Sequence, residues 1–340
     1  MTADDAATRR QHGPARSLEA LWYSDSPLVW LLLPLSLLYW VLTGLRKACY
    51  RIGLFKSNKL DVPVVVVGNI TAGGAGKTPV VIWLARQLAA NGYKPGIVSR
   101  GYGGKRRSDL MAVTADSDPS EAGDEPVLIA RSTGFPVQVC SRRTSAALAL
   151  LSRGDVDVIV ADDGLQHYAL RRDVELAVVD GERRLGNRWL LPAGPLREPA
   201  SRLLSVDQVL HNGGADSTRN RFVLVPGPAV NLRSGEQKAL AEFSGQAVQA
   251  LAGIGNPQRF YTLLGEHGIS STPLDVPDHG KLADSELPLT ATLLMTEKDA
   301  IKYDAVTGDD WWYVPVRAVF EPNNERELLA TITAKLRTSS

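Results

Sequence analysis

The sequence predicts an α/β protein in which a parallel β-sheet carries helices on both faces, with a smaller second α/β domain and an N-terminal membrane helix. Short β-branched runs alternate with helical patterns through the middle of the chain, as parallel strands joined by helices require. One such run, 64–67, leads into a glycine-rich turn that ends in Gly76-Lys77-Thr78. An apolar stretch over 27–45, of roughly 19 residues, matches the thickness of a bilayer core.

Length and composition limit the possible classes of protein. A chain of 340 residues with 44% hydrophobic content can bury a sizeable core and would ordinarily form about two domains. The formal net charge is +1, so nothing global indicates a nucleic-acid partner, and we expect none. The two cysteines, Cys49 and Cys140, make neither a disulfide framework nor a metal-site spacing, which is typical of a reducing cytosol.

Changes in composition divide the chain into segments. The stretch around Pro226-Gly227-Pro228 is typical of a linker. The expected segments are 1–50 for an N-terminal tail and anchor helix, 51–218 for a core domain built around the glycine-rich turn, 219–245 for the linker, and 246–340 for the smaller C-terminal α/β domain.

The first expected element is a membrane helix over 27–45, which is apolar apart from Ser36, Tyr39 and Thr43. A basic cluster follows directly and favours the cytoplasmic side and anionic head groups. We therefore expect an anchor at the membrane surface with the body of the protein in the cytosol. A buried core helix and a helix lying along the interface are alternatives, whereas the long apolar stretch disfavours a secretory signal peptide. The basic cluster consists of Arg46, Lys47, Arg51, Lys56 and Lys59.

The elements of the body follow in a regular order. Apolar residues at helical spacing predict a helix over 80–90, which Asn91-Gly92 ends before a strand at 96–99. This alternation implies a parallel sheet whose ligands bind at the carboxyl ends of the strands. The next expected elements are a strand at 136–140, a helix at 144–152, a strand at 156–161, and strands at 176–179 and 208–210. The second unit is expected to hold strands at 247–252 and 291–295 and a helix at 257–267.

The glycine-rich turn indicates a phosphate-binding loop, as in P-loop NTPases, because glycines let backbone N–H groups surround phosphate oxygens. Lys77 would add a point charge, and the Thr78 hydroxyl could ligate Mg²⁺. The strict G-x-x-x-x-G-K-[ST] pattern has glycine where this chain has Thr71. A glycine-rich surface turn is the alternative. The expected nucleotide-binding residues are Thr71, Ala72, Gly73, Gly74, Ala75, Gly76, Lys77 and Thr78.

Two carboxylates, Asp162 and Asp163, follow the buried strand 158–161 at the point where it leaves the sheet. In enzymes with a phosphate loop this position holds the Mg²⁺ that bridges phosphate oxygens. Acidic residues at a strand end can also be turn formers. Since Lys77 and Thr78 occur in the same chain, we expect Thr78, Asp162 and Asp163 to form the metal site.

A second acidic pair, Asp124-Glu125, precedes Pro126. Asp124 is a candidate catalytic base for an acceptor hydroxyl, and helix capping is its alternative role. His279 could orient or share that base, although a loop histidine is more often solvated. The basic segment 100–107 could contact a phosphorylated substrate or the membrane, or be solvated. The stretch 296–299 could recognise a base or cap the next helix.

Several short motifs occur in a fixed order after the apolar helix. They are Gly68-Asn69-Ile70-Thr71 leading to Gly76-Lys77-Thr78-Pro79, Ser99-Arg100-Gly101-Tyr102-Gly103, Gly123-Asp124-Glu125-Pro126, Asp162-Asp163-Gly164-Leu165-Gln166-His167, Leu191-Pro192-Ala193-Gly194-Pro195-Leu196-Arg197-Glu198 and Thr296-Glu297-Lys298-Asp299. Together they resemble the tetraacyldisaccharide 4′-kinase family, the lipid A 4′-kinases, over nearly the whole chain.

The resemblance implies ATP-dependent phosphorylation of the 4′-hydroxyl of a tetraacylated glucosamine disaccharide 1-phosphate, a lipid A disaccharide precursor, in lipid A biosynthesis. It also implies a bacterial inner-membrane location with the catalytic body facing the cytoplasm. By the same resemblance, Asp124 paired with His279 is the expected base, and Asp162 and Asp163 are the metal end of the site. Which aspartate binds the metal directly is left open.

The expected mechanism follows from these assignments. Lys77 and the loop N–H groups hold the β- and γ-phosphates of ATP, Thr78 and one aspartate hold Mg²⁺, and Asp124 accepts the hydroxyl proton. The rival hypothesis is a membrane-tethered P-loop nucleotide switch that acts on a protein partner and phosphorylates no small molecule.

Overall fold

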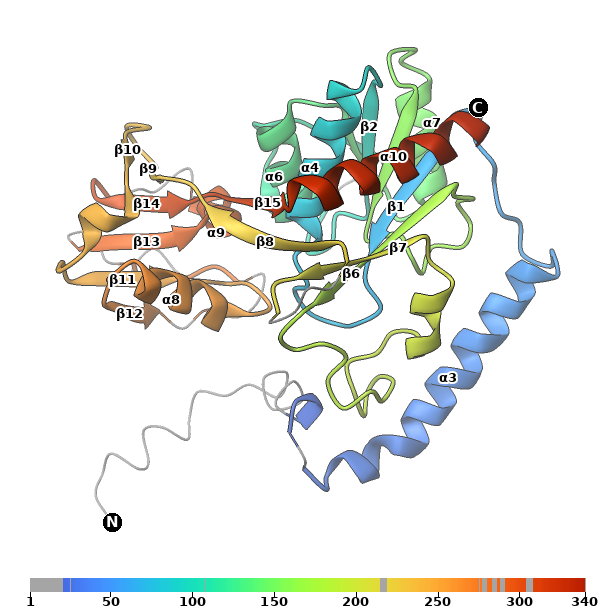
Figure 1. The fold of residues 1–340 in the computed structure, drawn as a ribbon, viewed down its shortest axis with the longest axis horizontal. Coiled ribbons are helices and arrows are strands. Elements are labelled where there is room, and N and C mark those ends of the chain that lie inside the picture. Colours follow the sequence, from blue (N-terminus) through green and yellow to red (C-terminus); the bar gives the residue numbers. More distant parts are fainter. Residues whose placement is uncertain are drawn as a thin grey trace.

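The computed structural model describes residues 21–24, 26–106, 108–214, 219–274, 276, 280–282, 286–287, 291–303 and 308–339. Within these residues the strands form two sheets, one of nine strands and one of six (Figure 1). Both sheets are mostly parallel and covered by helices, so the predicted α/β class is confirmed.

The larger sheet has the strand order β15-β8-β7-β6-β1-β5-β2-β4-β3. The central strand β1 (Val64–Gly68) is buried on both faces, as its continuous β-branched run predicts, and it pairs in parallel with β5 and β6. Only β3 and β15 pair antiparallel, at the two edges. The other strands are β2 (Pro95–Ser99), β3 (Met111–Val113), β4 (Val137–Val139), β5 (Val158–Asp162), β6 (Val174–Asp180), β7 (Gln208–Asn212), β8 (Arg221–Pro226) and β15 (Val316–Phe320).

Helices cover both faces of this sheet. One face packs against α4 (Lys77–Ala90), α6 (Asp124–Thr133) and α10 (Pro322–Ser339), whose apolar residues share one core cluster. The opposite face packs against α7 (Arg143–Leu151), which belongs to a second cluster. The short helices α5 (Pro119–Ala122) and η1 (Ala200–Leu204) complete this part. The predicted order of strand, phosphate loop and helix is therefore present.

The smaller sheet has the order β10-β9-β14-β13-β11-β12 and its own apolar clusters. Its four strands β11 to β14 run in parallel, while β9 and β10 join antiparallel. The strands are β9 (Ala229–Asn231), β10 (Gln237–Lys238), β11 (Val248–Leu251), β12 (Ser271–Leu274), β13 (Thr292–Thr296) and β14 (Trp311–Val314). The helices are η2 (Leu240–Phe243), α8 (Pro257–Glu266), α9 (Glu297–Ala300) and η4 (Ile301–Tyr303).

The chain crosses between the two sheets twice. The expected linker, 219–245, holds β8 of the larger sheet and β9 and β10 of the smaller one. After β14 the chain returns through β15, which pairs antiparallel with β8, and ends in α10 on the larger sheet. Figure 1 shows β8 and β15 side by side between the two sheets. Residues 219–245 therefore contain strands of both sheets rather than forming a linker, and the C-terminal segment returns to the larger sheet. Pairing between strands some ninety residues apart leaves no local pattern in the sequence, so this arrangement could not be predicted.

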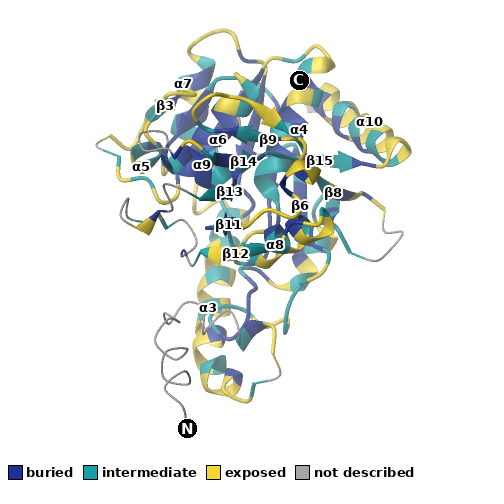
Figure 2. Cartoon of the chain, turned by 90° about the vertical axis from the view of Figure 1, so that its left-hand side faces the viewer, coloured by how far each residue is buried: buried dark blue, intermediate teal, exposed yellow. Residues whose placement is uncertain are grey.

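Helix α3 (Val29–Arg51) contains residues 29–45 of the expected apolar stretch 27–45 and is the one described helix long and apolar enough to cross a membrane. Only Val29 and Ser36 of its residues are buried, so α3 is not a buried core helix. Figure 2 shows the helix mostly exposed, at the end of the molecule. The Ser36 hydroxyl donates to the Leu190 carbonyl at 2.8 Å and accepts from the Ala193 N–H at 3.0 Å. A narrow polar side of α3 thus binds the segment 190–197, while its apolar sides face outward.

Candidate active site

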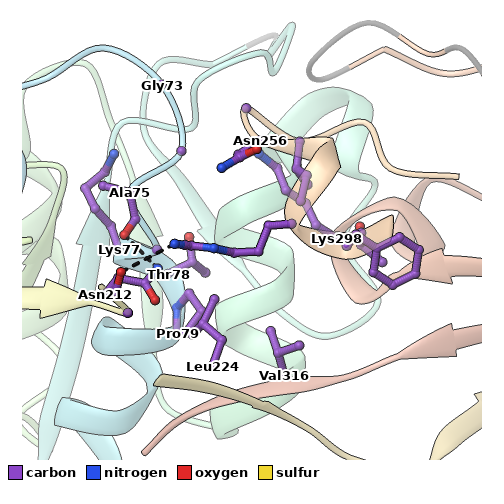
Figure 3. A pocket seen from close by; sticks show the side chains of 18 of the residues that line it. Gly73, Ala75, Lys77, Thr78, Pro79, Asn212, Leu224, Asn256, Lys298 and Val316 are labelled. Atoms are coloured by element: carbon purple, nitrogen blue, oxygen red, sulfur yellow. Dashed lines mark hydrogen bonds between the residues drawn. The ribbon is translucent and has the colours of Figure 1, made fainter. Parts of the chain in front are cut away.

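The phosphate loop joins β1 to α4 and has the backbone that its glycines allow. Gly73 and Gly76 have φ values of 97° and 90°, in the left-handed region that favours glycine. Gly76 is also the N-cap of α4 and offers no side chain to the first N–H groups, which are left for a ligand. A Cβ at Gly76 would lie 2.4 Å from the Asn212 Nδ2. The same Nδ2 donates to the Ala75 carbonyl at 3.1 Å, so Asn212 braces the loop (Figure 3).

The segment 190–197 holds the other side of the loop. The Ala72 N–H donates to the Pro195 carbonyl at 2.7 Å, and the Arg197 N–H donates to the Ile70 carbonyl at 2.7 Å. Thr71 is buried and forms an isolated bridge with Leu196. Thr71, which stands where the strict pattern has glycine, therefore lies against the segment 190–197, whereas residues 72–78 line the cavity.

Lys77 is the first residue of α4, and its side chain lies among polar groups. Its Nζ is 3.5 Å from the Asp163 Oδ1 and 3.4 Å from the Asn69 Oδ1. The structure thus brings together the predicted lysine and one predicted aspartate, and it adds Asn69, which belongs to a sequence motif but had no predicted role.

The two aspartates at the end of β5 have different surroundings. Asp162 is 1% exposed; its Oδ2 accepts from the Ser99 hydroxyl at 3.0 Å, while its Oδ1 is buried without a hydrogen-bond partner. Burial, with the nearby charges of Glu125 and Asp163, raises the pKa of Asp162 to about 7.

Asp163 faces the cavity, and both of its carboxylate oxygens accept from the Arg197 Nη1, at 3.0 and 2.9 Å. Burial acts to raise the pKa of Asp163, but Lys77 and Arg197 outweigh it and hold that pKa well below its usual range. The buried Arg143 donates to the backbone carbonyls of Asp162 and Asp163, at 3.3 and 2.8 Å. Arg143 carried no signal in the sequence, and Arg197 appeared only within a motif.

Asp124 is the first residue of α6, after Gly123 at the N-cap. Its side chain is buried, and its Oδ1 accepts from the Glu125 N–H at 3.0 Å. Its Oδ2 lies 3.8 Å from the Lys298 Nζ and 3.7 Å from the Lys302 Nζ. Because Gly123 is the N-cap of α6, Asp124 is not the capping residue. His279 lies outside the described residues, so its pairing with Asp124 stays a prediction.

In the stretch 296–299, Thr296 caps helix α9, and capping is one of the two roles predicted for this stretch. The Thr296 hydroxyl accepts from the Asp299 N–H at 3.2 Å at the start of α9. Lys298 also reaches across to the larger sheet, where its Nζ donates to the Glu125 Oε1 at 3.1 Å. In the basic segment 100–107, Arg106 donates to the Gly101 carbonyl at 2.9 Å, and Arg107 lies outside the described residues.

One cavity of about 1220 Å³ lies between the two sheets and is lined by Lys77, Asp163, Arg197, Glu125 and Lys298, whereas Asp124 and Asp162 are not among its lining residues. Figure 3 shows Lys77 and Thr78 on one side of it and Asn256 and Lys298 on the other. Such a volume accommodates a nucleotide together with part of a second substrate. The phosphate loop, Asp163 and Arg197 line the side of the larger sheet, and the segment 254–256 with α8 lines the opposite side.

Comparisons with known proteins identify the family of the chain. The family model for tetraacyldisaccharide-1-P 4′-kinase matches residues 28–336. A tetraacyldisaccharide 4′-kinase of Haemophilus influenzae (strain 86-028NP) is 49% identical over 302 residues, which cover 87% of this chain and 90% of the relative. The crystal structure of an LpxK from Aquifex aeolicus in complex with ATP has a TM-score of 0.74 and 29% identity, covering 91% of this chain and 99% of the other.

Proposed function

Since the chain belongs to the tetraacyldisaccharide 4′-kinase family, we propose that it transfers the γ-phosphate of ATP to the lipid 4′-hydroxyl through the cavity between its two sheets. The acceptor is a tetraacylated glucosamine disaccharide 1-phosphate of lipid A biosynthesis. One observation supports this location above the others: the phosphate loop, Asp163 directly after β5, and Glu125, next to Asp124, line the same cavity.

Residues 72–78 bind the triphosphate in this proposal. The N–H groups at the start of α4 and the Lys77 ammonium face the β- and γ-phosphates, and ATP in the crystallised Aquifex relative supports this assignment. Arg197 supplies a further positive charge on the same side of the cavity. Charge neutralisation and positioning then supply most of the catalysis, as in other phosphoryl transfers.

Mg²⁺ fits the oxygen atoms at the end of β5. The buried Asp162 Oδ1 lacks a hydrogen-bond partner and is a hard oxygen ligand, whereas both Asp163 oxygens are bonded to Arg197. We therefore assign direct ligation to Asp162 and Thr78, with Asp163 holding Lys77 and Arg197 in place. The described residues contain no group of three His, Cys, Asp or Glu side chains that could hold a metal, and Mg²⁺ commonly uses one or two carboxylates plus substrate phosphates. Bound there, Mg²⁺ would neutralise phosphate charge.

Asp124 is the proposed base, with His279 as its partner. As the 4′-oxygen bonds to the γ-phosphorus, the bond to the β–γ bridging oxygen breaks, ADP leaves, and the hydroxyl proton passes to the Asp124 carboxylate. The family assignment favours this transfer over the rival nucleotide switch, in which no lipid would be phosphorylated.

The exposed apolar sides of α3 and the basic residues at its end support a location on the bacterial inner membrane with the body in the cytoplasm. In that arrangement the lipid precursor reaches the cavity from the membrane surface without leaving it entirely.

The test is transfer of labelled γ-phosphate from Mg·ATP to a tetraacyl disaccharide 1-phosphate in detergent, with Lys77→Ala beside the unaltered protein. We expect lipid-dependent transfer that Lys77→Ala abolishes. Nucleotide hydrolysis of equal rate with and without the lipid would contradict the proposal and favour the switch.

A further inference from the structure

Five buried or partly buried charged side chains form a continuous row from the smaller sheet to the larger one. Going along the row, the separations are 2.9 Å for Asp299–Lys302, 3.7 Å for Lys302–Asp124, 3.8 Å for Asp124–Lys298 and 3.1 Å for Lys298–Glu125. The signs of charge alternate at every step. We call these residues, Asp299, Lys302, Asp124, Lys298 and Glu125, the charge row.

The charge row is largely buried, and its Lys298–Glu125 end lies at the cavity. The side chains of Asp299, Asp124 and Lys302 are 0%, 6% and 8% exposed, and that of Lys298 is 15% exposed. A buried charge is costly unless it is paired, so each ammonium here depends on two carboxylates. Asp124 occupies the middle position, with an ammonium on each side.

The two lysines attract the Asp124 carboxylate but donate no hydrogen bond to it. Their Nζ atoms lie 3.7 and 3.8 Å from the Oδ2, beyond hydrogen-bonding distance. Lys302 donates to Asp299 at 2.9 Å and to the Gly280 carbonyl at 3.1 Å, and Lys298 donates to Glu125 at 3.1 Å. The Asp124 Oδ1 accepts from a backbone N–H at the start of α6. The two ammonium groups thus place positive charge beside the Oδ2, while a backbone hydrogen bond fixes the Oδ1.

The charge row also joins Asp124 to the part of the smaller sheet that meets the phosphate loop. The Asp299 Oδ2 accepts from the Gly253 N–H at 2.8 Å. Two residues later, the Gly255 carbonyl accepts from Arg183 of the larger sheet's loops at 2.9 Å. The Asp299 carboxylate therefore holds both Lys302, which faces Asp124, and the segment 253–255, which lies against the phosphate loop.

We propose that Lys298 and Lys302 are positioning residues that orient the Asp124 carboxylate toward the acceptor hydroxyl, so that the base is correctly placed only when the smaller sheet is docked. The proposal rests on the proposed role of Asp124 as base. Because α9 and η4 carry both lysines and α6 carries Asp124, neither sheet alone contains the complete arrangement.

The first experiment substitutes each lysine by methionine, which keeps the length and removes the charge, and by arginine, which keeps the charge. Steady-state kinetics of lipid phosphorylation, ATP binding at equilibrium and thermal unfolding are measured for each. We expect Lys302→Met and Lys298→Met to lower kcat by roughly 10- to 100-fold, as misplacement of a catalytic group does. The Kd for ATP should change less than about threefold, and arginine should restore part of kcat. Lys335→Met is the control, since Lys335 pairs with Asp207 away from the cavity.

A double-mutant cycle with Asp124→Asn separates this proposal from the proposed function. If the lysines act through Asp124, their substitution should lower kcat no further in the Asp124→Asn background. A full additional loss there, or weakened ATP binding and lower Tm with unchanged kcat, would overturn the positioning role while leaving Asp124 as the base. If Asp124→Asn itself left kcat unchanged, the base assignment in the proposed function would fail instead.

Discussion

Gly74 of the phosphate loop and Gly255 of the smaller sheet are in backbone contact: a Cβ built on Gly255 would lie 2.5 Å from the Gly74 nitrogen and 3.2 Å from its Cα. No side chain fits between these two segments. The approach brings α8 and the phosphate loop to opposite sides of the same cavity.

Gly255→Ala should therefore separate the two segments and weaken ATP binding, because the backbone of Gly74 cannot yield as a flexible side chain would. We expect the KM for ATP to rise by about tenfold or more, with a smaller change in Tm. Gly265→Ala is the matched control in α8, since its Cβ would meet nothing within 4 Å. Equal effects of the two substitutions would show that the contact with Gly74 is unimportant.

Arg197→Met should lower kcat/KM by roughly 100-fold, since it removes the positive charge whose Nη1 bonds both oxygens of Asp163. Activity assays at several ATP concentrations would measure this effect. Arg153→Met is the comparison, because Arg153 pairs with Asp155 in an exposed ion pair of similar length. Retention of full activity by Arg197→Met would contradict a role for this charge.

The two aspartates at the end of β5 should respond differently to loss of charge. Asp162→Asn should raise the Mg²⁺ concentration needed for half-maximal activity by about tenfold or more, because Asp162 has the oxygen without a hydrogen-bond partner. Asp163→Asn should lower kcat with a smaller change in the Mg²⁺ requirement, since its oxygens hold Arg197. Mg²⁺ titrations of activity test this ranking, and the reverse order would reassign the direct ligand to Asp163.

His167 should make the protein less stable as the pH falls below neutrality. Burial, with Arg143 and Arg172 nearby, lowers the pKa of His167 from 6.5 to about 4. Between these values the unfolded state binds a proton that the folded state excludes, so this residue lowers the free energy of unfolding as the pH falls from about 6.5 toward 4 and has no effect above that range.

Urea unfolding between pH 7.5 and 5 would measure this dependence, and His167→Gln should show a shallower decline than the unaltered protein. Parallel curves for the two proteins would contradict the predicted contribution of His167.

The local parts of the fold and site could be predicted from the sequence. The phosphate loop follows from β-branched residues, glycines and Lys77-Thr78 within one short stretch, and the pair Asp162-Asp163 follows from its place at the end of a buried strand. Both signals depend on residues adjacent in the sequence. The approach of Lys77 to Asp163 depends in addition on the parallel pairing of β1 with β5, which places the ends of both strands at the same edge of the sheet.

The contacts between distant segments could not be predicted. Nothing in the sequence distinguishes Arg143 from the other arginines. In the structure, α7 places its guanidinium where it donates to the backbone carbonyls of Asp162 and Asp163. Lys302 meets Asp124 only because α9 and η4 dock on α6. The return of β15 and α10 to the larger sheet likewise depends on antiparallel pairing with β8, for which sequence periodicity gives no register.

The segment 190–197 makes the apolar helix α3 a structural support of the phosphate loop rather than a detachable tether. Ser36 bonds Leu190 and Ala193 on one side of that segment, and the backbone of Arg197 bonds the phosphate loop on the other. A truncation that removes α3 would take away these partners of the segment 190–197, so we expect it to loosen residues 72–78, the proposed triphosphate-binding loop.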